Sequence, residues 1–272
     1  MRIISWNIRA GGGRRALEIA EQLRIWSPDV IVLCEFRATE PSRAIAAELR
    51  ASGWRYQRTT ADPGHPTINA VLVASGYPIR SVRLACAPDE PHRWLHVHVA
   101  SPQSLAILAL HAPNRASGRK YPFLNAVTDA ARAWRGPPSI VIGDSNSGRI
   151  GIDEETPAFN ATEDRWMSRM EELGWRDAFR TVHAERREFT WYSPNGNNGF
   201  RIDQAFLHPH LLPRLTAVAH HWGGGALGRR DRLSDHAALV LDLDGPLPSP
   251  RCRFMRPPAP RKSDPLPKPA LR

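Results

Sequence analysis

Cysteine is scarce in this chain of 272 residues, which limits what can hold the fold together. The three cysteines, Cys34, Cys86 and Cys252, lie far apart, and no two of them form a CxxC pair. A disulfide framework needs more cysteines than this, and a structural zinc site needs closely spaced ones. The sequence therefore predicts a protein of a reducing compartment whose fold depends on an apolar core.

Long apolar runs are scarce as well, and we expect no signal peptide in residues 1–7. Residues 1–7 have neither the apolar core nor the small-residue cleavage site of a signal peptide, and no later run is long enough to cross a bilayer. We therefore expect a cytoplasmic protein without a membrane span. We also expect it to act as a monomer.

Lysine is nearly absent, although the chain is basic. The formal net charge is +10, and only three of the 37 basic residues are lysines. Seven basic residues and one acidic residue fall within residues 245–272, which leaves a charge of +4 for residues 1–244. A basic balance attracts polyanions such as nucleic acid, but an excess of arginine fits a bias in genome composition equally well.

One catalytic domain and a tail account for the length. A chain of 272 residues lies near the upper end of what one layered domain uses, and 42% hydrophobic residues are typical of a globular protein. We assign residues 1–244 to the catalytic domain. Residues 245–272 hold nine prolines among basic residues and cannot form a packed layer, so we expect a disordered Pro/Arg-rich tail. This tail is either a nonspecific arm for phosphate backbones or a solvated terminus.

Apolar periodicity predicts alternating strands and helices early in the chain and consecutive strands later. Apolar residues at helical spacing predict a first helix, at Ala16, Ile19, Ala20 and Leu23, and others near 42–51, 121–134 and 163–173. Strands are predicted at 2–8, 29–35, 67–74, 94–100, 105–111, 139–144, 201–207 and 237–243. This order favours an α/β fold, a four-layer sandwich of two mixed β-sheets packed face to face and flanked by helices.

Polar residues recur at the ends of the predicted strands. One carboxylate in such a position is usually a turn residue or a helix cap, but six polar strand ends that meet at one edge would form a metal site with acid and base partners. The six segments are Trp6-Asn7, Cys34-Glu35, Leu110-His111, Gly143-Asp144-Ser145-Asn146, Arg201-Ile202-Asp203 and Ser234-Asp235-His236. The set favours hydrolysis of a phosphate ester.

Glu35 and Asn7 are candidate metal ligands, because Mg2+ and Mn2+ prefer carboxylate and amide oxygens. The alternative for Glu35 is a strand-end charge that faces water. Asp144 and Asn146 are two residues apart and would point to the same side of an extended chain, so that one orients the attacking water and the other holds a phosphate oxygen. The alternative for this pair is an Asx turn after a buried strand.

Two histidines are candidates for proton and charge chemistry. His236 directly follows Asp235, so that the carboxylate can approach a metal while the imidazole faces the phosphate. Asp203 can accept a hydrogen bond from that imidazole and keep it cationic, which would stabilise charge on the phosphoryl oxygens. His111 closes an apolar strand and can donate a proton to the leaving oxygen.

Two further histidines alternate with apolar residues on one predicted strand. This spacing can be mistaken for that of metal ligands, but a strand that alternates polar and apolar residues normally turns such side chains to solvent. We therefore expect His96 and His98 to face water.

The elements GDxN, RID and SDH, in this order, resemble the endonuclease/exonuclease/phosphatase superfamily, which includes exonuclease III-like abasic endonucleases and pancreatic-type deoxyribonuclease. The match covers roughly residues 1–243. The resemblance implies metal ligation at Asn7 and Glu35 with acidic support from Asp235, handling of water and phosphate by Asp144 and Asn146, and a pair between Asp203 and His236. Together the three elements are a specific signal, whereas each alone is weak.

Two subfamily signatures are mixed in the chain. The stretch from Thr190-Trp191-Tyr192 to Asp203 is similar to exonuclease III-type repair enzymes, which implies that Trp191 and Phe200 form a pocket for a base-free sugar. His111 is instead similar to the deoxyribonuclease group, where a histidine at this place serves as the general acid. The chain departs from the family pattern in Ser145, where an aromatic residue is frequent, and in Arg9, where some members have an acidic metal neighbour. The substrate-binding residues that we expect are Asn114, Trp191, Phe200 and Arg201.

The most favoured function is Mg2+- or Mn2+-dependent cleavage of DNA phosphodiester bonds by metal- and Asp-assisted attack of water. A phosphatase or phosphodiesterase for a small molecule or a phospholipid head group is an alternative, because the superfamily uses one metal site for both. A non-catalytic nucleic-acid-binding module is a second alternative, but such a module has no need of all six polar strand ends. Salt separates the first two, since only a nuclease loses affinity steeply as salt rises.

Overall fold

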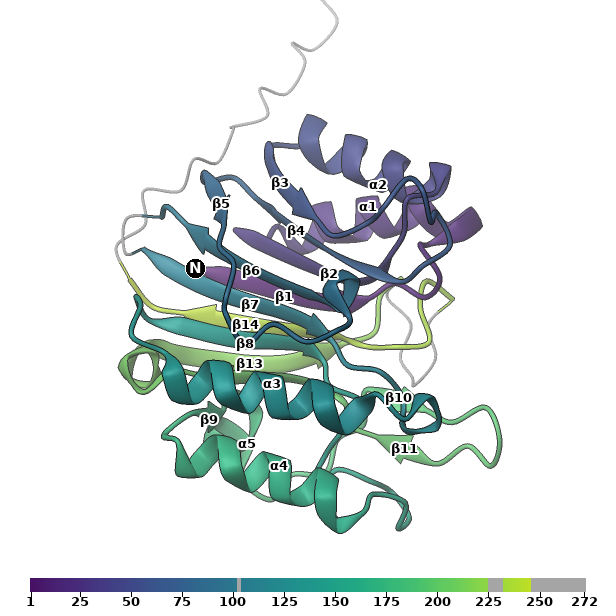
Figure 1. The fold of residues 1–272 in the computed structure, drawn as a ribbon. Coiled ribbons are helices and arrows are strands. Elements are labelled where there is room, and N and C mark those ends of the chain that lie inside the picture. Colours follow the sequence, from purple (N-terminus) through teal and green to yellow (C-terminus); the bar gives the residue numbers. More distant parts are fainter. Residues whose placement is uncertain (102–103, 225–231, 246–272) are drawn as a thin grey trace, which may run out of the picture.

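Two six-stranded β-sheets face each other, and helices cover their outer sides (Figure 1). The computed structural model describes residues 1–101, 104–224 and 232–245. The expected four-layer α/β sandwich is confirmed. Of the expected tail, only Gly245 lies within the described residues, so that the prediction for residues 246–272 falls outside them.

Each sheet contains one parallel pair of strands among antiparallel ones. The first sheet consists of β1 (Arg2–Asn7), β2 (Val30–Phe36), β3 (Tyr56–Thr59), β4 (Ala70–Ser75), β13 (Leu215–His221) and β14 (Ala238–Leu243), in the order β13-β14-β1-β2-β4-β3. The second consists of β5 (Ile79–Ser81), β6 (Trp94–Val99), β7 (Leu105–His111), β8 (Ser139–Asp144), β9 (Arg176–Asp177) and β12 (Asp203–Leu207), in the order β5-β6-β7-β8-β12-β9. A two-stranded ribbon, β10 (Trp191–Tyr192) with β11 (Gly199–Phe200), stands apart.

Alternate residues of each strand enter different apolar layers, as the pleat of a strand requires. In β1, Ile3 packs between the sheets, whereas Ile4 and Trp6 pack toward the helices. The helices are α1 (Ala16–Trp26), α2 (Glu40–Ala51), α3 (Lys120–Ala133), α4 (Ala161–Glu172) and α5 (Ala178–His183). The helices α1 and α2 cover the first sheet, and α3 and α4 cover the second. None of the helices in the described part of the chain is long and apolar enough to span a membrane.

Strand direction gathers the polar strand ends at one edge of the sandwich. The strands β1 and β2 run in parallel, as do β7 and β8, so that their carboxyl ends meet. The strands β14 and β12 run antiparallel to β1 and β8, so that these two strands begin where the others end. In Figure 1 this edge lies on the right, toward β10 and β11, because β1 starts at the label N on the left.

All eight predicted strands and all four predicted helices are present, with bounds that differ by up to three residues. The elements that we did not predict are short or exposed. The edge strands β3 and β13 bury few side chains and therefore show no clear apolar alternation. The helix α5 has six residues, too few for a helical period to stand out.

Candidate active site

Asn7 connects the two sheets at the polar edge. It ends β1, where its backbone pairs with Cys34 of β2. Its buried Nδ2 donates to Asp144 Oδ2 at 2.9 Å and lies 3.4 Å from Glu35 Oε1. A carboxylate of the first sheet and one of the second are therefore held close to the same amide.

Glu35 sits at a β-bulge, and the bulge aims its side chain. The pairing of β2 with β4 changes register between Cys34 and Phe36, and Glu35 has a φ of 57°. A glutamate rarely adopts this left-handed conformation, so the surrounding structure must stabilise it. Glu35 Oε2 accepts a hydrogen bond from the backbone N–H of Ala10 at 2.6 Å, which fixes the carboxylate.

Asp144 ends the buried strand β8 in a tight turn. A Cβ at the preceding Gly143 would lie 1.8 Å from the carbonyl oxygen of Leu110, so that only glycine fits there. Asp144 Oδ1 accepts a hydrogen bond from the N–H of Asn146 at 3.0 Å, and Asn146 has a φ of 49°. The expectation that both residues share one side of an extended chain is therefore wrong, because the Asx turn bends the chain between them.

A buried lysine that sequence reasoning missed anchors this turn. Lys120 Nζ donates to the backbone oxygen of Asn146 and to Glu163. The amide of Asn146 donates to the backbone oxygen of Ala112 at 2.8 Å. Lys120 is the only lysine among residues 1–244, and this rarity is the one signal that sequence offered for it.

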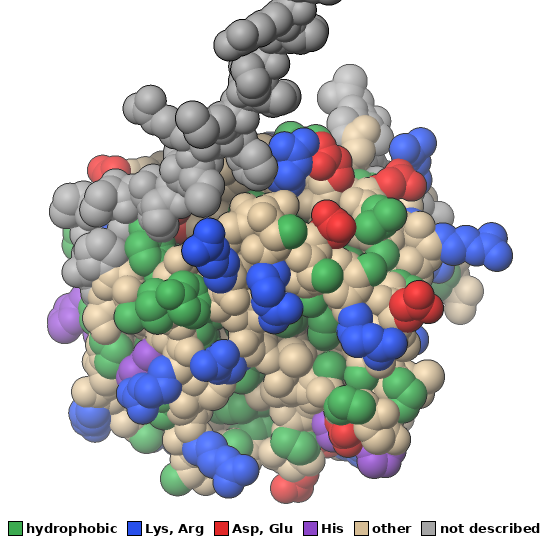
Figure 2. Space-filling view, turned by 90° about the horizontal axis from the view of Figure 1, so that it is seen from above, with side chains coloured by type: hydrophobic (Ala, Val, Ile, Leu, Met, Phe, Trp, Pro, Cys, Tyr) green, Lys and Arg blue, Asp and Glu red, His purple; other side chains and the backbone are tan. Residues whose placement is uncertain are grey.

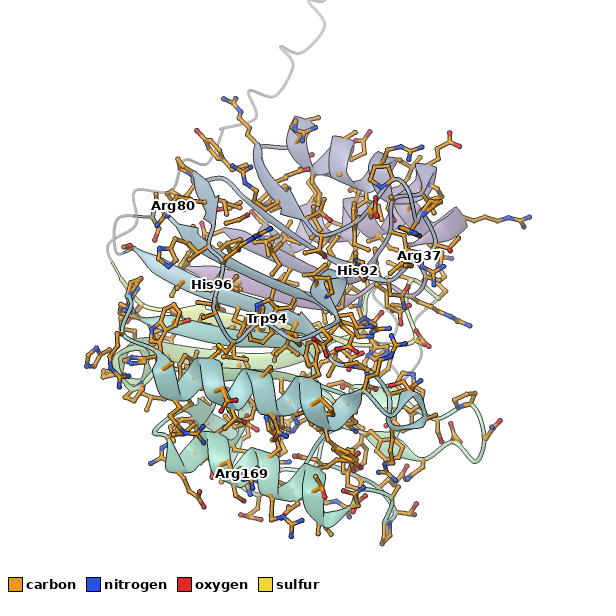
Figure 3. All side chains as sticks on the ribbon, in the orientation of Figure 1. Arg37, Arg80, His92, Trp94, His96 and Arg169 are labelled. Atoms are coloured by element: carbon orange, nitrogen blue, oxygen red, sulfur yellow. The ribbon has the colours of Figure 1, made fainter. Side chains whose placement is uncertain are left out.

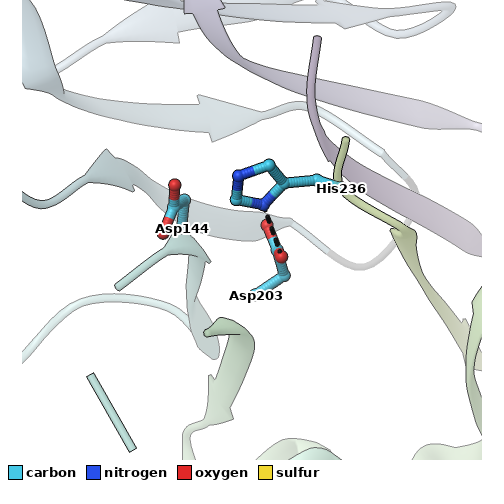
Figure 4. A group of neighbouring side chains, drawn as sticks. All are labelled: Asp144, Asp203 and His236. Carbon is cyan, nitrogen blue, oxygen red and sulfur yellow. Dashed lines mark hydrogen bonds and ion pairs between the residues drawn. The ribbon is translucent and has the colours of Figure 1, made fainter. Parts of the chain in front are cut away.

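Asp203 and His236 form a buried pair beside Asp144 (Figure 4). His236 Nδ1 lies 2.9 Å from Asp203 Oδ2. Burial alone would lower the pKa of His236, but the charge of Asp203 and the hydrogen bond to it more than offset this effect and raise the pKa to about 9. His236 is therefore a cation at neutral pH.

The environment of Asp144 favours its protonated form. Burial, followed by the charge of Asp203, raises the pKa of Asp144 to about 7, although His236 and the hydrogen bond from Asn7 oppose this shift. Asp144 and Asp203 are register partners in the antiparallel strands β8 and β12. A carboxylate whose pKa lies near 7 can take up a proton at neutral pH and release it again, as a general base must.

His111 and Arg93 lie against each other next to these carboxylates. His111 Nε2 is 3.7 Å from Asp144 Oδ2, and Arg93 Nη1 is 2.9 Å from His111 Nδ1. Burial, and then the charge of Arg93, hold the pKa of His111 well below its usual value. The ring is therefore neutral near pH 7, which does not suit a proton donor in this state. Arg93 ends the short helix η2 (Pro91–Arg93), and no motif drew attention to it.

Trp191 and Phe200 border the Asp203–His236 pair. The ring centroid of Trp191 lies 6.1 Å from that of His236 and 5.9 Å from that of Phe200. Both aromatic rings are half-buried, so that part of each faces solvent. Asn114 is exposed and caps the short helix η3 (Arg115–Ser117) by accepting a hydrogen bond from the N–H of Ser117 at 3.1 Å. The substrate roles expected for these three residues stay predictions.

Arg201 does not have the place that we expected. It is completely buried, and it forms ion pairs with Asp153 at 2.8 Å and with Asp177 at 2.6 Å. The structure contradicts a contact with substrate, because these two carboxylates and not a ligand neutralise the guanidinium. Asp203, two residues further along, is buried as well.

His96 is a second correction. It lies on β6 with its ring buried, and Trp134 packs edge-on against it with ring centroids 5.0 Å apart. Figure 3 shows His96 and Trp94 of the same strand, and the apolar layer that contains Trp94 is the one under α3. The helix α3 covers this face of the second sheet. Both faces of β6 are therefore buried, and the alternation of polar and apolar residues along the strand does not mark a solvent-facing side. His98, the next residue on that face, is half-buried.

Oxygen donors at the polar edge fit a hard divalent cation. Among the described residues, Asp203 Oδ1 and Asp235 Oδ1 are buried and have no hydrogen-bond partner. Leaving a buried carboxylate oxygen unpaired is costly, and a cation would satisfy it. Asp144, Asp203 and His236 can each place a ligand atom within 4.8 Å of the others, but a protonated His236 cannot bind a metal.

The ligand set expected from sequence, Asn7, Glu35 and Asp235, agrees better with this chemistry. It leaves the proton on His236 and uses the unpaired oxygen of Asp235. In the present side-chain orientation, Asn7 turns its nitrogen to the carboxylates while Oδ1 accepts from the N–H of Arg9 at 3.0 Å. Asn7 can offer its Oδ1 to a cation at the carboxylates only after its side-chain amide flips. Arg9 Nε also lies 3.9 Å from Asp235 Oδ2 and would compete with the cation.

Solved structures with a similar fold are nucleases and a phosphatase. The 3'-5' exonuclease NExo from Neisseria meningitidis is 23% identical, with a TM-score of 0.74, and the likeness covers 90% of this chain and 100% of that one. A structure described as the 3' phosphatase NExo from Neisseria, bound to a product DNA hairpin, is 23% identical with a TM-score of 0.73 and the same coverage. An AP endonuclease from Archaeoglobus fulgidus is 19% identical, with a TM-score of 0.73 and the same coverage.

At sequence identities of 19% to 23%, the similarity to these structures establishes the fold alone. No curated protein sequence matches this chain. The family model described as "Endonuclease/Exonuclease/phosphatase family" matches residues 4–236, which is most of the chain. The protein therefore belongs to the endonuclease/exonuclease/phosphatase family.

Proposed function

We propose that this protein is a Mg2+- or Mn2+-dependent phosphoesterase that cleaves DNA phosphodiester bonds. One observation carries the proposal. A candidate base with a pKa of about 7, Asp144, and a cation with a pKa of about 9, His236, are buried at one edge beside further carboxylates. Groups with shifted pKa values at one place are typical of a catalytic site.

The roles follow from these charge states. Asp144 takes a proton from water while the water oxygen bonds to phosphorus and the bond from phosphorus to the leaving oxygen breaks. His236, kept cationic by Asp203, stabilises the charge that develops on the phosphoryl oxygens. Asn146 would hold a phosphate oxygen. A cation bound by Glu35, Asp235 and Asn7 would add positive charge at the same oxygens.

Arg93 would bind the substrate phosphate from the other side. Its hydrogen bonds go to His111, and among the described residues it forms no direct ion pair, although the charges of Asp144 and Glu35 act on it. A half-buried guanidinium without a direct ion pair is costly, and a phosphate oxygen would supply one. The same phosphate would raise the pKa of His111 again, so that His111 could then protonate the leaving oxygen.

DNA is the substrate class that we favour. The similar structures are described as an exonuclease, an AP endonuclease and a phosphatase with a DNA hairpin product. Trp191 and Phe200 offer partly exposed aromatic surface next to His236, on which a base or a deoxyribose can pack. Action as a cytoplasmic monomer is part of the same proposal.

A phosphomonoesterase for a smaller substrate is the second candidate, and charge favours it. Residues 1–244 have a formal charge of only +4. Figure 2 shows basic side chains scattered over one face and not gathered in a single patch. A protein that tracks a nucleic-acid backbone usually presents such a patch.

A substrate panel tests both candidates. Purified full-length protein is incubated with Mg2+ or Mn2+ and with abasic duplex, intact duplex, single-stranded DNA, RNA or p-nitrophenyl phosphate, and EDTA and the Asp144→Ala variant serve as controls. We expect metal-dependent cleavage of DNA that weakens steeply as salt rises. Turnover of the monoester alone, with little salt dependence, would favour the second candidate. No turnover of any substrate would leave a binding module and end the proposal.

A further inference from the structure

A buried polar network joins the two strands that carry Asp144 and Asp203. Ser145 Oγ lies 3.0 Å from Gln204 Oε1, and Gln204 Nε2 donates to the backbone oxygens of Ser147 at 2.9 Å and Arg201 at 3.2 Å. Ser145 is 1% exposed and Gln204 is 2% exposed. Both polar atoms of the Gln204 side chain therefore have protein partners, away from water.

The two carboxylates next to this network repel each other when both are ionised, and the cation His236 offsets part of this repulsion. Asp144 and Asp203 are directly opposite each other in the antiparallel pair β8–β12, and both are buried. Like charges at opposite positions of a sheet destabilise the pairing. The two carboxylates stand at the end of the ladder, because β8 stops at Asp144 and β12 starts at Asp203.

Ser145 and Gln204 counteract this repulsion from the adjacent positions. The backbone N–H of Ser145 donates to the Ile202 oxygen at 2.8 Å, and Ser145 Oγ lies 3.0 Å from the same oxygen. Ser145 follows Asp144 directly, and Gln204 follows Asp203 directly. A shift of either carboxylate would therefore break hydrogen bonds in a place where water cannot replace them. An apolar pair could fill the same space but could not tie the strands together.

We propose that Ser145 and Gln204 are positioning residues, whose hydrogen bonds hold Asp144 and Asp203 in the geometry that phosphate-ester hydrolysis needs. The inference rests on the proposed function. Neither side chain touches substrate, and both act through the carboxylate that precedes them. A displacement of about 1 Å in a catalytic group can lower the rate roughly a hundredfold.

Four variants test this role. Ser145→Ala removes the hydroxyl, Gln204→Met replaces the amide by an apolar chain of similar length, the double variant combines both, and Ser145→Thr keeps a hydroxyl. Thr128→Val is the matched control, because Thr128 is a buried residue of α3 whose hydroxyl donates to the Leu124 oxygen at 3.0 Å. The values of kcat and KM are measured on the best substrate of the panel, well below each variant's melting temperature.

We expect kcat to fall about tenfold to a hundredfold in Ser145→Ala and Gln204→Met, with KM within about twofold of wild type. The double variant should lose no more than about the worse single variant, because the two residues form one unit. Ser145→Thr should keep most of the kcat, and so should Thr128→Val. An unchanged kcat in both single variants, or a loss through KM alone, would overturn the proposal.

Hydrogen exchange separates this inference from the proposed function. If wild type hydrolyses none of the substrates, the proposed function fails, and exchange of the Ser145 amide hydrogen still tests the network. We expect Gln204→Met to speed this exchange about tenfold relative to wild type, while amides in the middle of β8 keep their protection. Equal protection in both proteins would show that the network does not hold the strands.

Discussion

Two regions of the molecule each bury a histidine beside a tryptophan, and the two histidines have opposite properties. His236 is 6% exposed and His96 is 2% exposed. The ring of Trp191 lies 6.1 Å from His236, and the ring of Trp134 lies 5.0 Å from His96. Yet the pKa of His236 is raised to about 9, whereas burial lowers the pKa of His96 to about 4.

The difference lies in the partner and not in the burial. Asp203 meets His236 at 2.9 Å, whereas neither ring nitrogen of His96 has a hydrogen-bond partner among the described residues. Desolvation penalises the charged form of both rings, and only a nearby carboxylate reverses its effect. Burial beside a tryptophan therefore does not by itself mark a catalytic histidine, and His96 packs against Trp134 on the side of the sheet that α3 covers.

Replacing each histidine by glutamine should give the largest contrast. We expect His236→Gln to lower kcat about a thousandfold, because a neutral amide cannot stabilise developing phosphoryl charge as a cation does. His96→Gln should keep kcat within about twofold, since His96 pairs with Leu108 inside the sheet and contacts none of the strand ends that form the site. Steady-state rates on the best substrate, with circular dichroism to verify folding, measure both effects.

Comparable losses of kcat in the two variants would contradict the proposed difference between His236 and His96. Full activity in both variants would contradict it as well. His236→Gln leaves Asp203 without its partner, so its melting temperature is measured first and the assay is run well below it.

Acid should destabilise the protein through His96. The folded pKa of about 4 lies below the value of 6.5 for a free histidine, so that between these pH values the unfolded chain binds a proton that the folded chain does not. The stability that the neutral ring contributes is present above pH 6.5 and is lost as pH falls toward 4, by at most about 3 kcal/mol in total. His236 has the opposite sign, because its raised pKa makes stability fall as pH rises toward 9.

Urea unfolding at pH 7 and at pH 4.5 measures this effect, with His96→Gln as the matched variant. Other groups titrate in the same range, so the relevant quantity is the change in unfolding free energy of wild type minus that of the variant. We expect wild type to lose more stability than His96→Gln. An equal loss in both would mean that His96 takes up its proton as readily in the folded state as in the unfolded chain.

Sequence predicted the fold well because the buried strands carry their own signal. The runs that became β7 and β8 are continuously apolar and end in polar residues, so even their bounds were correct. Edge strands such as β13 bury one face poorly, and their pattern resembles that of a loop. The polar edge was predictable for the same reason, since Asn7, Asp144 and His236 lie at the ends of recognisable strands.

The errors concern what lies next to a residue in space. Nothing near Arg201 in the sequence reveals its ion pairs, because its partners Asp153 and Asp177 are 48 and 24 residues away. His96 was expected at the surface because the helix over its strand comes later in the chain. Arg93 and Lys120 reach the site from segments without a motif. Burial by a distant element, and charge partners across the fold, leave no local pattern to read.

The dependence of rate on pH should sharpen the contrast at the active site. Asp144 must be deprotonated to act as a base, so kcat should rise about tenfold per pH unit below its pKa of about 7. His236 must stay protonated, so kcat should fall again above its pKa of about 9. We expect a plateau between these values in wild type and the same profile in His96→Gln. A profile without either limb would exclude these two groups from the rate-limiting step.

The smallest effect expected is at the two tryptophans. Trp191 is half-buried beside His236, and loss of a ring that stacks on a base or sugar costs about 1 kcal/mol at the low end, which is about a fivefold rise in KM. We therefore expect Trp191→Ala to raise KM about fivefold on DNA and Trp191→Phe to restore it. Trp134→Ala removes a tryptophan of similar burial beside His96 and should lower the melting temperature with KM unchanged. If Trp134→Ala raised KM as much as Trp191→Ala does, the distinction between a substrate-facing and a purely structural His–Trp pair would be lost.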